Sequence, residues 1–503
     1  MSLKEEQLKV GAFFTPLEWA VFAIAQSGIF EKWIEGATIF DPTMGEGGLL
    51  EALLLYGQSK GVNINKLPVN NLYGVELNTG FFVAFKKRMR DQYSIEFSEN
   101  QFLNSDILFL KQDLKFDILF GNPPWQNYVD LPEEYKLRVK DSFFKYGLVE
   151  DRRKLLLGGS RIDIAALIIQ KTIYCNLKAG GEAWFFMPLS LLLNEGASMQ
   201  FRKFTICETR YALRKVYDLE KAEVFKGVNT RYGLVNFKRD AITNYPVDYQ
   251  YYNNGIFEQH YARPLLDPTN SLSILPEKKA DPLKDFNLIK IPKKSIPRQG
   301  LNTCGANDIY FFDNYKLLEG GYCQISNRRN TLRVPRQFVF PLIDKTNFKE
   351  ELIVPKKWVL LPYTLENKPL GMNELLKYPT LLAYFNLKRE ILIKRKGPYI
   401  KSLINRGFWW ALLGVGEYNF ASFKIVWESY GRKLFLPKIF SGQWQAGQSL
   451  QSFIPCESEE EADRICKALG DKQIMEYLLS LKMDGTMNWA QPGKIKKLLI
   501  LED

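Results

Sequence analysis

The fold of this chain can be worked out from one stretch, Phe116-Asp117-Ile118-Leu119-Phe120-Gly121-Asn122-Pro123-Pro124-Trp125. Its first six residues predict a short buried strand, and the Asn-Pro-Pro-Trp that follows predicts a rigid turn. The prolines hold φ at about −65° and lack N–H donors, so backbone carbonyls are left as acceptors. Asn122 adds a side-chain oxygen, and the ring of Trp125 offers a stacking surface. Such a turn can hold a flat molecule that carries an exocyclic amino group.

The same turn also has a purely structural interpretation. Asn-Pro often starts a turn, Pro-Pro often ends a strand, and a tryptophan that follows often packs in a core. Short motifs match by chance, so these four residues alone do not decide between the two interpretations. The segments before them favour the functional one.

A glycine-rich turn lies upstream of this motif. Residues 37–40 predict a buried strand, residues 49–54 predict the start of a helix, and the turn between them is Asp41-Pro42-Thr43-Met44-Gly45-Glu46-Gly47-Gly48. A strand, a glycine turn and a helix N-terminus in this order let backbone amides approach a ligand closely.

Two acidic residues follow the next two predicted strands. Glu76 ends the apolar run 71–76, a spacing at which a carboxylate typically accepts hydrogen bonds from ribose hydroxyls. Asp106 follows the short run 102–104, and its carboxylate could accept a hydrogen bond from the amino group of an adenine while Ile107 packs on the ring.

The glycine turn, both acids and the amide turn each follow the C-terminal end of a successive predicted strand. In an open α/β sheet this edge is where ligands bind. A nicotinamide-dependent enzyme would show the first three elements but would not need the fourth. The order therefore favours chemistry on an amino group.

Further motifs lie in the first 240 residues, at 11–16, 161–168, 177–181, 183–188, 224–230 and 232–237. With them, the chain resembles the N6-adenine DNA methyltransferases of the S-adenosylmethionine-dependent amino-methyltransferase type. Within that type it is similar to the subgroup in which the cofactor motifs come first and a target-recognition domain is C-terminal. The resemblance is looser beyond residue 240.

This resemblance implies an α/β fold with two domains. Residues 1–240 are expected to form a Rossmann-like catalytic domain with a mostly parallel seven-stranded sheet, and residues 241–503 a mixed α+β target-recognition domain. The implied reaction transfers a methyl group from S-adenosylmethionine to N6 of an adenine flipped out of double-stranded DNA. The enzyme would act at a specific sequence, in a restriction-modification or phage-defence system.

The resemblance also implies roles for single residues. The implied catalytic residues are Asn122, Pro123, Pro124, Trp125 and Phe225. The implied cofactor-binding residues are Phe13, Thr15, Pro16, Asp41, Pro42, Gly45, Gly47, Glu76, Asp106, Ile107 and Asn122. In this scheme the Asn122 oxygen and the Pro123 carbonyl accept the two amino hydrogens, while Trp125 and Phe225 clamp the base. Many members of the family have Tyr or Phe in place of Trp125, and Met44 and Glu46 occupy positions where smaller residues are common.

Charge is uneven along the chain. Residues 1–240 carry 31 Lys and Arg against 29 Asp and Glu, whereas residues 241–503 carry 37 against 27. A duplex is densely negative, so the basic second half predicts a DNA-facing surface. The alternative is that these cations solvate an ordinary domain. The candidate DNA contacts are Arg328, Arg329 and residues 333–336 in basic loops, and Lys388, Arg389, Lys394, Arg395 and Lys396 on or after a probable helix.

Several functional classes are disfavoured by composition. The single histidine, His260, and six cysteines without a Cys-x-x-Cys spacing suggest neither a metal site nor a disulfide framework. No apolar run approaches the roughly 18 to 20 residues of a membrane helix, and the start of the chain does not resemble a signal peptide. We therefore expect a cytoplasmic, monomeric protein without a metal.

Alternatives within and outside methyl transfer remain open. Protein N5-glutamine methyltransferases also use an Asn-Pro-Pro-aromatic turn, but they are shorter and lack a large basic domain. A catalytically silent specificity subunit is disfavoured because every predicted chemical position is filled. The first motif starts at Gly11, so we expect no nuclease before it, although a separate nuclease partner is compatible with the sequence. The charged segment 130–151 is expected to be a loop that closes over the flipped base.

Overall fold

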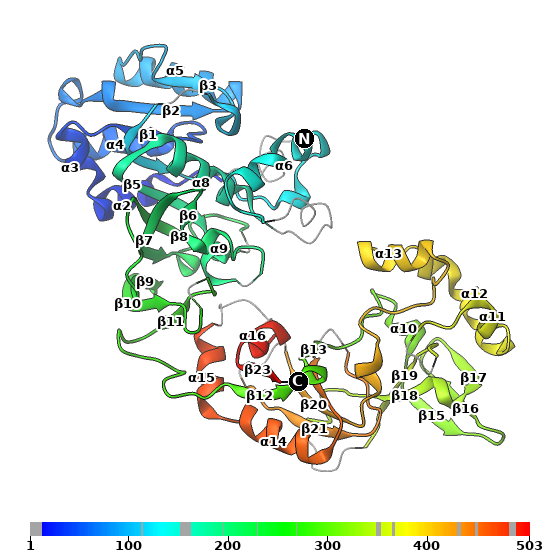
Figure 1. The fold of residues 1–503 in the computed structure, drawn as a ribbon. Helices are drawn as coiled ribbons and strands as arrows, with labels where there is room; N and C mark the ends of the chain where they lie inside the picture. Colours follow the sequence, from blue (N-terminus) through cyan, green and yellow to red (C-terminus); the bar gives the residue numbers. More distant parts are fainter. Residues whose placement is uncertain are drawn as a thin grey trace. The chain divides into compact units, whose positions relative to one another are not determined.

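The computed structural model divides the chain into two compact units, Met1–Asp281 and Pro282–Asp503, drawn in Figure 1. The described residues are 13–111, 114–150, 162–194, 196–228, 230–267, 269–348, 354–364, 368–429, 434–447, 451–481 and 489–502. Of the predicted motif residues, Gly11, Ala12, Arg161 and Asn229 lie outside them. The division falls later than residue 240 because the strands that follow continue the sheet of the first unit.

A mixed sheet forms the centre of unit 1. Its described strands are β1 Ile39–Asp41, β2 Leu72–Glu76, β3 Phe102–Asn104, β4 Phe116–Gly121, β5 Leu177–Pro188, β6 Thr205–Ile206, β7 Thr209–Asp218, β8 Tyr232–Arg239, β9 Val247–Asn253, β10 Ile256–Arg263 and β11 Ser273–Leu275. Their order is β11-β10-β9-β7-β8-β5-β4-β1-β2-β3, and β6 pairs with β7.

Strands β3, β2, β1, β4 and β5 are neighbours in this order, and each pairs in parallel with the next. Strand β8 runs antiparallel to both β5 and β7. The seven neighbouring strands β3-β2-β1-β4-β5-β8-β7 thus have the mostly parallel arrangement that was predicted. The predicted strand number is too small, however, because β9 pairs with β7 and the antiparallel strands β10 and β11 extend the sheet further.

Helices pack on this sheet and join it in one core. Those of unit 1 in the described residues are α2 Leu17–Ser27, α3 Ile29–Ile34, α4 Gly48–Ser59, α5 Thr79–Tyr93, α6 Glu133–Lys145, α8 Ile164–Asn176 and α9 Ser190–Leu193. Ile24, Trp33 and Leu53 belong to the same buried cluster as Ile118 and Phe120 of β4. Helix α8 is buried almost all round, as expected for a helix that is apolar on every face.

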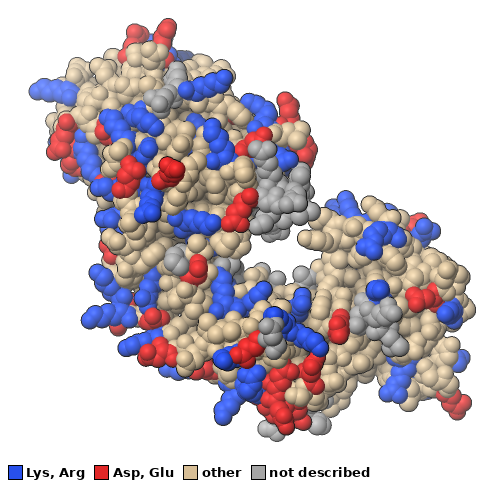
Figure 2. All heavy atoms as spheres, viewed as in Figure 1, with Lys and Arg blue, Asp and Glu red and all other residues tan. Residues whose placement is uncertain are grey.

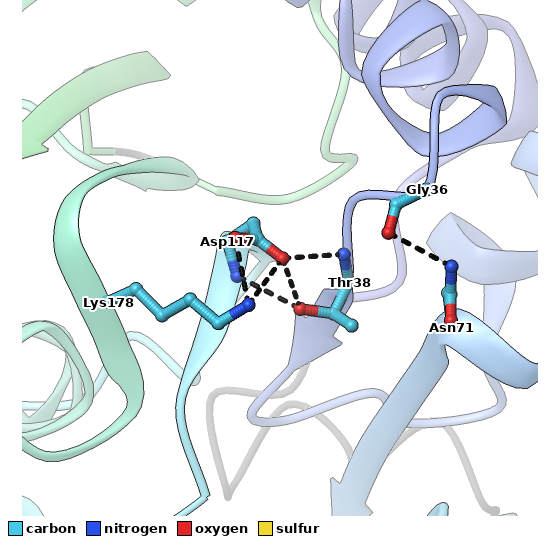
Figure 3. A network of polar contacts seen from close by, with 5 residues as sticks. All are labelled: Gly36, Thr38, Asn71, Asp117 and Lys178. Atoms are coloured by element: carbon cyan, nitrogen blue, oxygen red, sulfur yellow. Dashed lines mark hydrogen bonds and ion pairs between the residues drawn. The ribbon is translucent and has the colours of Figure 1, made fainter.

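A polar network fixes the amino end of β4 against its neighbours (Figure 3). Asp117 Oδ2 accepts hydrogen bonds from Thr38 N at 2.9 Å and Thr38 Oγ1 at 2.7 Å, and Lys178 Nζ lies 2.8 Å away. Burial would raise the pKa of Asp117, but the hydrogen bonds from Lys178 and Thr38 outweigh it and lower the pKa. The network holds the register in which Ile39 pairs with Ile118, and β4 then runs toward Asn122 at its other end.

Unit 2 combines small sheets with helices, the mixed α+β composition that was predicted. Its described strands are β12 Ile289–Pro292, β13 Arg298–Gln299, β14 Phe311–Phe312, β15 Asn314–Leu317, β16 Tyr322–Ser326, β17 Thr331–Pro335, β18 Val339–Leu342, β19 Lys357–Leu360, β20 Phe423–Glu428, β21 Lys438–Ser441, β22 Gln451–Cys456 and β23 Leu499–Glu502. Its described helices are α10 Asn307–Tyr310, α11 Met372–Leu375, α12 Pro379–Ile393, α13 Pro398–Asn405, α14 Glu459–Leu469, α15 Lys472–Ser480 and α16 Pro492–Lys496. The sheets are β12-β23, β13-β22-β20-β21, β14-β19-β18 and β15-β16-β17.

Some of the candidate DNA contacts of unit 2 lie within a strand or in the core. Arg333 lies within strand β17, and Arg336 follows the end of that strand. Arg395 is 5 % exposed and donates hydrogen bonds to backbone carbonyls, so it is wrong as a candidate DNA contact. Arg328 and Arg329 are exposed, as predicted.

Candidate functional site

A cavity of about 740 Å³ lies in unit 1, at the edge of the sheet where β1, β2, β3 and β4 end. The cavity is lined by the last residues of β1 and β2 and by residues that come just after β3 and β4: Asp41, Glu76, Asp106 and Asn122. Phe13, Phe14 and Thr15, which precede α2, form a further part of the wall. The structure therefore brings together at one site the four positions that were predicted from separate strands.

Backbone amides anchor Glu76 beside the glycine turn. Glu76 Oε2 accepts a hydrogen bond from Gly45 N at 2.8 Å, and Oε1 accepts one from Asn78 N at 2.6 Å. Gly45 has φ 57°, and a Cβ there would lie 2.7 Å from a ring carbon of Phe14. The turn thus requires glycine for its conformation and for the close approach of the Phe14 ring.

Asp41 is the most buried acid of the cavity. Its side chain is 1 % exposed, and Oδ1 accepts a hydrogen bond from Thr43 N at 3.0 Å. Burial raises the pKa of Asp41 to about 8, against the hydrogen bond from Thr43, and the nearby Glu76 raises it further. Asp41 therefore favours the neutral form up to about neutral pH.

One of the hydrogen bonds to the Asp106 carboxylate comes from a segment that was predicted to be a loop. Oδ1 accepts a hydrogen bond from Leu108 N at 2.9 Å, while Oδ2 accepts one from Tyr135 Oη at 3.0 Å. Tyr135 lies on α6, so the prediction of a loop over 130–151 is wrong for residues 133–145. Val139 and Phe143, one helical turn apart, are the buried side chains of this helix. Tyr135 lines the cavity, so α6 forms part of its wall.

The side-chain amide of Asn122 forms hydrogen bonds through its nitrogen, and its oxygen is buried. Its Nδ2 donates to Phe13 O at 2.7 Å and to Thr15 Oγ1 at 3.2 Å, which sets the orientation of the amide. Oδ1 is buried and has no hydrogen-bond partner among the described residues. Such a buried, unpaired acceptor is costly, and a donor on a ligand would satisfy it.

Aromatic rings surround the turn after Asn122. Pro124 lines the cavity, while Trp125 and Phe225 are 8 % and 5 % exposed and belong to the core beneath it. The two rings touch edge to face, with centroids 4.8 Å apart and an interplanar angle of 81°. A base therefore cannot lie between them as they stand, and the predicted clamp would require one ring to move.

Asp163 ties the same turn to helix α8. Its Oδ1 accepts hydrogen bonds from Gln126 N at 3.2 Å and from Ala165 N at 2.8 Å, the second of which caps the helix. Burial raises the pKa of Asp163 to about 6, although both hydrogen bonds oppose the shift. This side chain fixes the path of the chain directly after Trp125.

Some predicted residues contribute in other ways, and some lining residues were missed. Pro42, Ile107 and Thr15 line the cavity, whereas Pro16 and Gly47 are the residues before α2 and α4. A Cβ on Gly47 would lie 2.1 Å from the Phe85 ring, so this glycine serves packing. The lining residues that were not named as site residues include Phe14, Leu77, Asn78, Phe81, Arg88, Tyr135, Ile164 and Ile168. Their positions depend on how helices meet the sheet, which local patterns do not specify.

The sequence of residues 52–225 matches the family model described as Eco57I restriction-modification methylase. This segment covers β2 to β7 and contains Glu76, Asp106 and the Asn-Pro-Pro-Trp turn. The match confirms the predicted resemblance to the DNA adenine methyltransferases.

Curated relatives and solved structures agree with this match. The type II methyltransferases M.HincII and M.HindII, both from Haemophilus influenzae, are each 25 % identical over 236 residues, which is 47 % of this chain and 38 % and 37 % of theirs. The chain thus spans well under half the length of the curated relatives it matches. The type IIL restriction-modification enzyme MmeI, solved in complex with DNA, has a similar fold with a TM-score of 0.55 and 13 % identity, over 91 % of this chain and 64 % of that chain.

Membrane spans and metal sites are two further classes of feature that the described residues lack. Within the described ranges, no helix has the length and apolar character needed to cross a membrane. Among the same residues, no group of three His, Cys, Asp or Glu could hold a metal ion. His260 lies on β10, with Nε2 at 3.6 Å from Glu258 Oε2, away from the cavity.

Proposed function

We propose that this chain transfers a methyl group from S-adenosylmethionine to N6 of an adenine in double-stranded DNA. The observation that carries the proposal is the Asn122 oxygen, which is buried at a ligand cavity without a partner among the described residues. An exocyclic amino group offers the N–H donor that this oxygen lacks. The match of residues 52–225 to the restriction-modification methylases supports the same reaction.

The cavity fits S-adenosylmethionine in its chemistry. Glu76 would accept hydrogen bonds from the ribose hydroxyls, because each oxygen that Gly45 and Asn78 orient has a second lone pair. Asp106 would accept one from the adenine amino group, with Ile107 packed on the ring. Phe13, Thr15 and the glycine turn would surround the methionine end.

The chain's own residues would bind and orient the target base. The base must leave the duplex, which costs a few kcal/mol. Stacking on Trp125 would return about 1 to 3 kcal/mol once Trp125 or Phe225 moves out of their edge-to-face contact. Asn122 Oδ1 and the Pro123 carbonyl would accept the two amino hydrogens and draw the lone pair of the nitrogen out of conjugation. The bonds Nδ2 makes to Phe13 and Thr15 keep that oxygen in place.

These acceptors also match the charge that develops during the reaction. The amino nitrogen becomes positive, and two carbonyl oxygens stabilise that charge more in the transition state than in the ground state. When bound, S-adenosylmethionine would supply the electrophilic methyl group, with its sulfur as the leaving group. The extra proton on the nitrogen then leaves to water, so no strong base is required.

We further propose that unit 2 is the target-recognition domain and that the chain works in a restriction-modification system with a nuclease. The basic excess in residues 241–503 supports DNA as its partner. A protein that carries out this role would act in the cytoplasm, where its DNA is.

Incubation of the purified chain with labelled S-adenosylmethionine tests the proposal. Duplex DNA and a mixture of unmodified proteins are offered in separate reactions, and digested products are separated by chromatography. We expect label on duplex DNA, in N6-methyladenine. Label only on glutamine of proteins, or on a cytosine, would refute it.

A further inference from the structure

One short segment has a net positive charge almost as large as that of the whole second half of the chain. Residues 377–406, which we call the basic arm, contain eight Lys and Arg and a single acid, Glu390. This net charge of +7 compares with +10 for all of residues 241–503. The basic arm comprises α12 and α13, coloured yellow in Figure 1.

Seven of the eight cations of the basic arm, all but Arg395, reach the surface and form no ion pair with a described residue. Lys377, Arg389, Lys394, Lys396, Lys401 and Arg406 are exposed, and Lys388 is half-buried. Among the described residues, none of these seven forms an ion pair with a carboxylate. The lysines at the opposite edge of unit 2 differ, since Lys290, Lys294 and Lys472 pair with Glu502, Glu457 and Glu476. Figure 2 shows blue side chains over α12 and α13, whereas red ones gather over α14.

Buried Arg395 fixes the arm to the core of unit 2. It lies directly after α12, and its guanidinium donates to the carbonyl oxygens of Leu392, Thr303, Ala411 and Trp409 at 2.7 to 3.3 Å. Burial of a charged side chain costs free energy, and hydrogen bonds to its charged group offset that cost. The exposed cations on either side of it are therefore held on a rigid support.

Apolar side chains project between the cations. Leu387 is 77 % exposed, Ile391 is 57 % exposed and Tyr399 is 71 % exposed. Leu387 and Ile391 lie one helical turn apart on α12, on the face away from Leu381 and Phe385, which are buried. Large apolar side chains that face water in a row mark a surface that binds a partner.

We infer that the basic arm contacts the DNA duplex directly, with its cations on phosphates and its apolar row in a groove. This inference rests on the proposed function. The 15 residues of α12 span about 22 Å, and a helix about 10 to 12 Å wide fits the major groove. Leu387 and Ile391 meet sugars and thymine methyl groups there, while the unpaired cations displace counterions.

Fluorescence anisotropy with a long labelled duplex, over a series of salt concentrations, tests the inference. The arm variant combines Arg389→Gln, Lys394→Gln, Lys396→Gln and Lys401→Gln. The matched control removes the same charge from exposed sites elsewhere in unit 2 with Lys284→Gln, Lys467→Gln, Lys472→Gln and Lys496→Gln. We expect the arm variant to lose about 10- to 100-fold in affinity and about one unit of salt slope for each lost contact, and the control to lose far less.

A second variant separates the apolar row from the charge. Leu387→Gln with Ile391→Gln leaves the net charge unchanged and keeps good helix formers on the exposed face. We expect DNA affinity to fall about 5- to 10-fold with an unchanged salt slope. Wild-type affinity together with a changed oligomeric state would assign the row to a protein contact and overturn its place in the groove.

Methyl transfer by each protein distinguishes the two levels of failure. If the wild type neither binds nor methylates DNA, the proposed function is wrong. If the wild type methylates DNA while the folded arm variant keeps its affinity and salt slope, the inference about the basic arm is wrong and the proposed function stands. Circular dichroism and S-adenosylmethionine binding, which takes place in unit 1 under our proposal, show that each variant is folded.

Discussion

Removal of the Asn122 side chain is the change whose effect the site defines most sharply. In Asn122→Ala the target amino group loses one of its two acceptors, and Phe13 O and Thr15 Oγ1 lose the donor they share. Loss of one preorganised polar contact in a transition state typically lowers kcat by about 100- to 1000-fold. The two lost hydrogen bonds should cost about 1 to 3 kcal/mol of folding stability. We therefore expect a large loss of rate with a modest loss of stability.

Single-turnover methyl transfer to duplex DNA measures the rate, and calorimetry measures Tm. Asn104→Ala is the matched control, because Asn104 lies at the end of a strand and its Nδ2 donates to two carbonyls, those of Glu76 and Leu77. That variant should show a similar loss of Tm with a rate within about threefold of wild type. If Asn122→Ala also kept a rate within threefold, while its affinity for S-adenosylmethionine was normal, the assignment of Asn122 would be refuted.

Three other changes follow from the same contacts. Tyr135→Phe should weaken S-adenosylmethionine binding about 3- to 10-fold in titration calorimetry, because Asp106 loses the bond that fixes Oδ2; equal or tighter binding would contradict this. Because burial raises the pKa of Asp41, the wild type should lose stability as pH rises from about 4 to about 8, and Asp41→Asn should flatten that part of the Tm profile; parallel profiles would argue against the raised pKa. Asp117→Asn should lower the free energy of unfolding in urea by about 1 to 2 kcal/mol at neutral pH. The loss should become smaller as pH falls through the lowered pKa of Asp117, and a loss independent of pH would count against its pairing with Lys178.

The ends of the strands were predictable because each carries a local signal. Asp41, Glu76, Asp106 and Asn122 all follow short apolar runs, and parallel strands bring such ends to one edge of a sheet. The seven-stranded part of the sheet was expected only from the resemblance to the methyltransferase family. Strands β9 to β11 were assigned to the second domain because prolines nearby interrupt the pattern, whereas pairing with β7 places them in unit 1.

The missed features depend on contacts between distant segments. Residues 133–145 are highly charged and bury only two side chains, so the sequence shows little helical periodicity there. For this reason neither the helix nor the contact of Tyr135 with Asp106 was predicted. The sequence around Arg395 indicates a surface cation, yet its buried guanidinium donates to the carbonyls of Leu392, Thr303, Trp409 and Ala411. The contact of Trp125 with Phe225 joins residues a hundred positions apart, and their distance is a property of the packed core.

Sequencing of modified bases tests the central claim most directly. The chain is expressed in a bacterial host that lacks its own DNA methylation, and genomic DNA is sequenced by a method that detects N6-methyladenine. We predict N6-methyladenine within one recurring sequence in cells that express the wild type, and none in cells that express Asn122→Ala. Unmodified adenines with the wild-type protein in folded, soluble form, or an equal signal from the variant, would contradict the account.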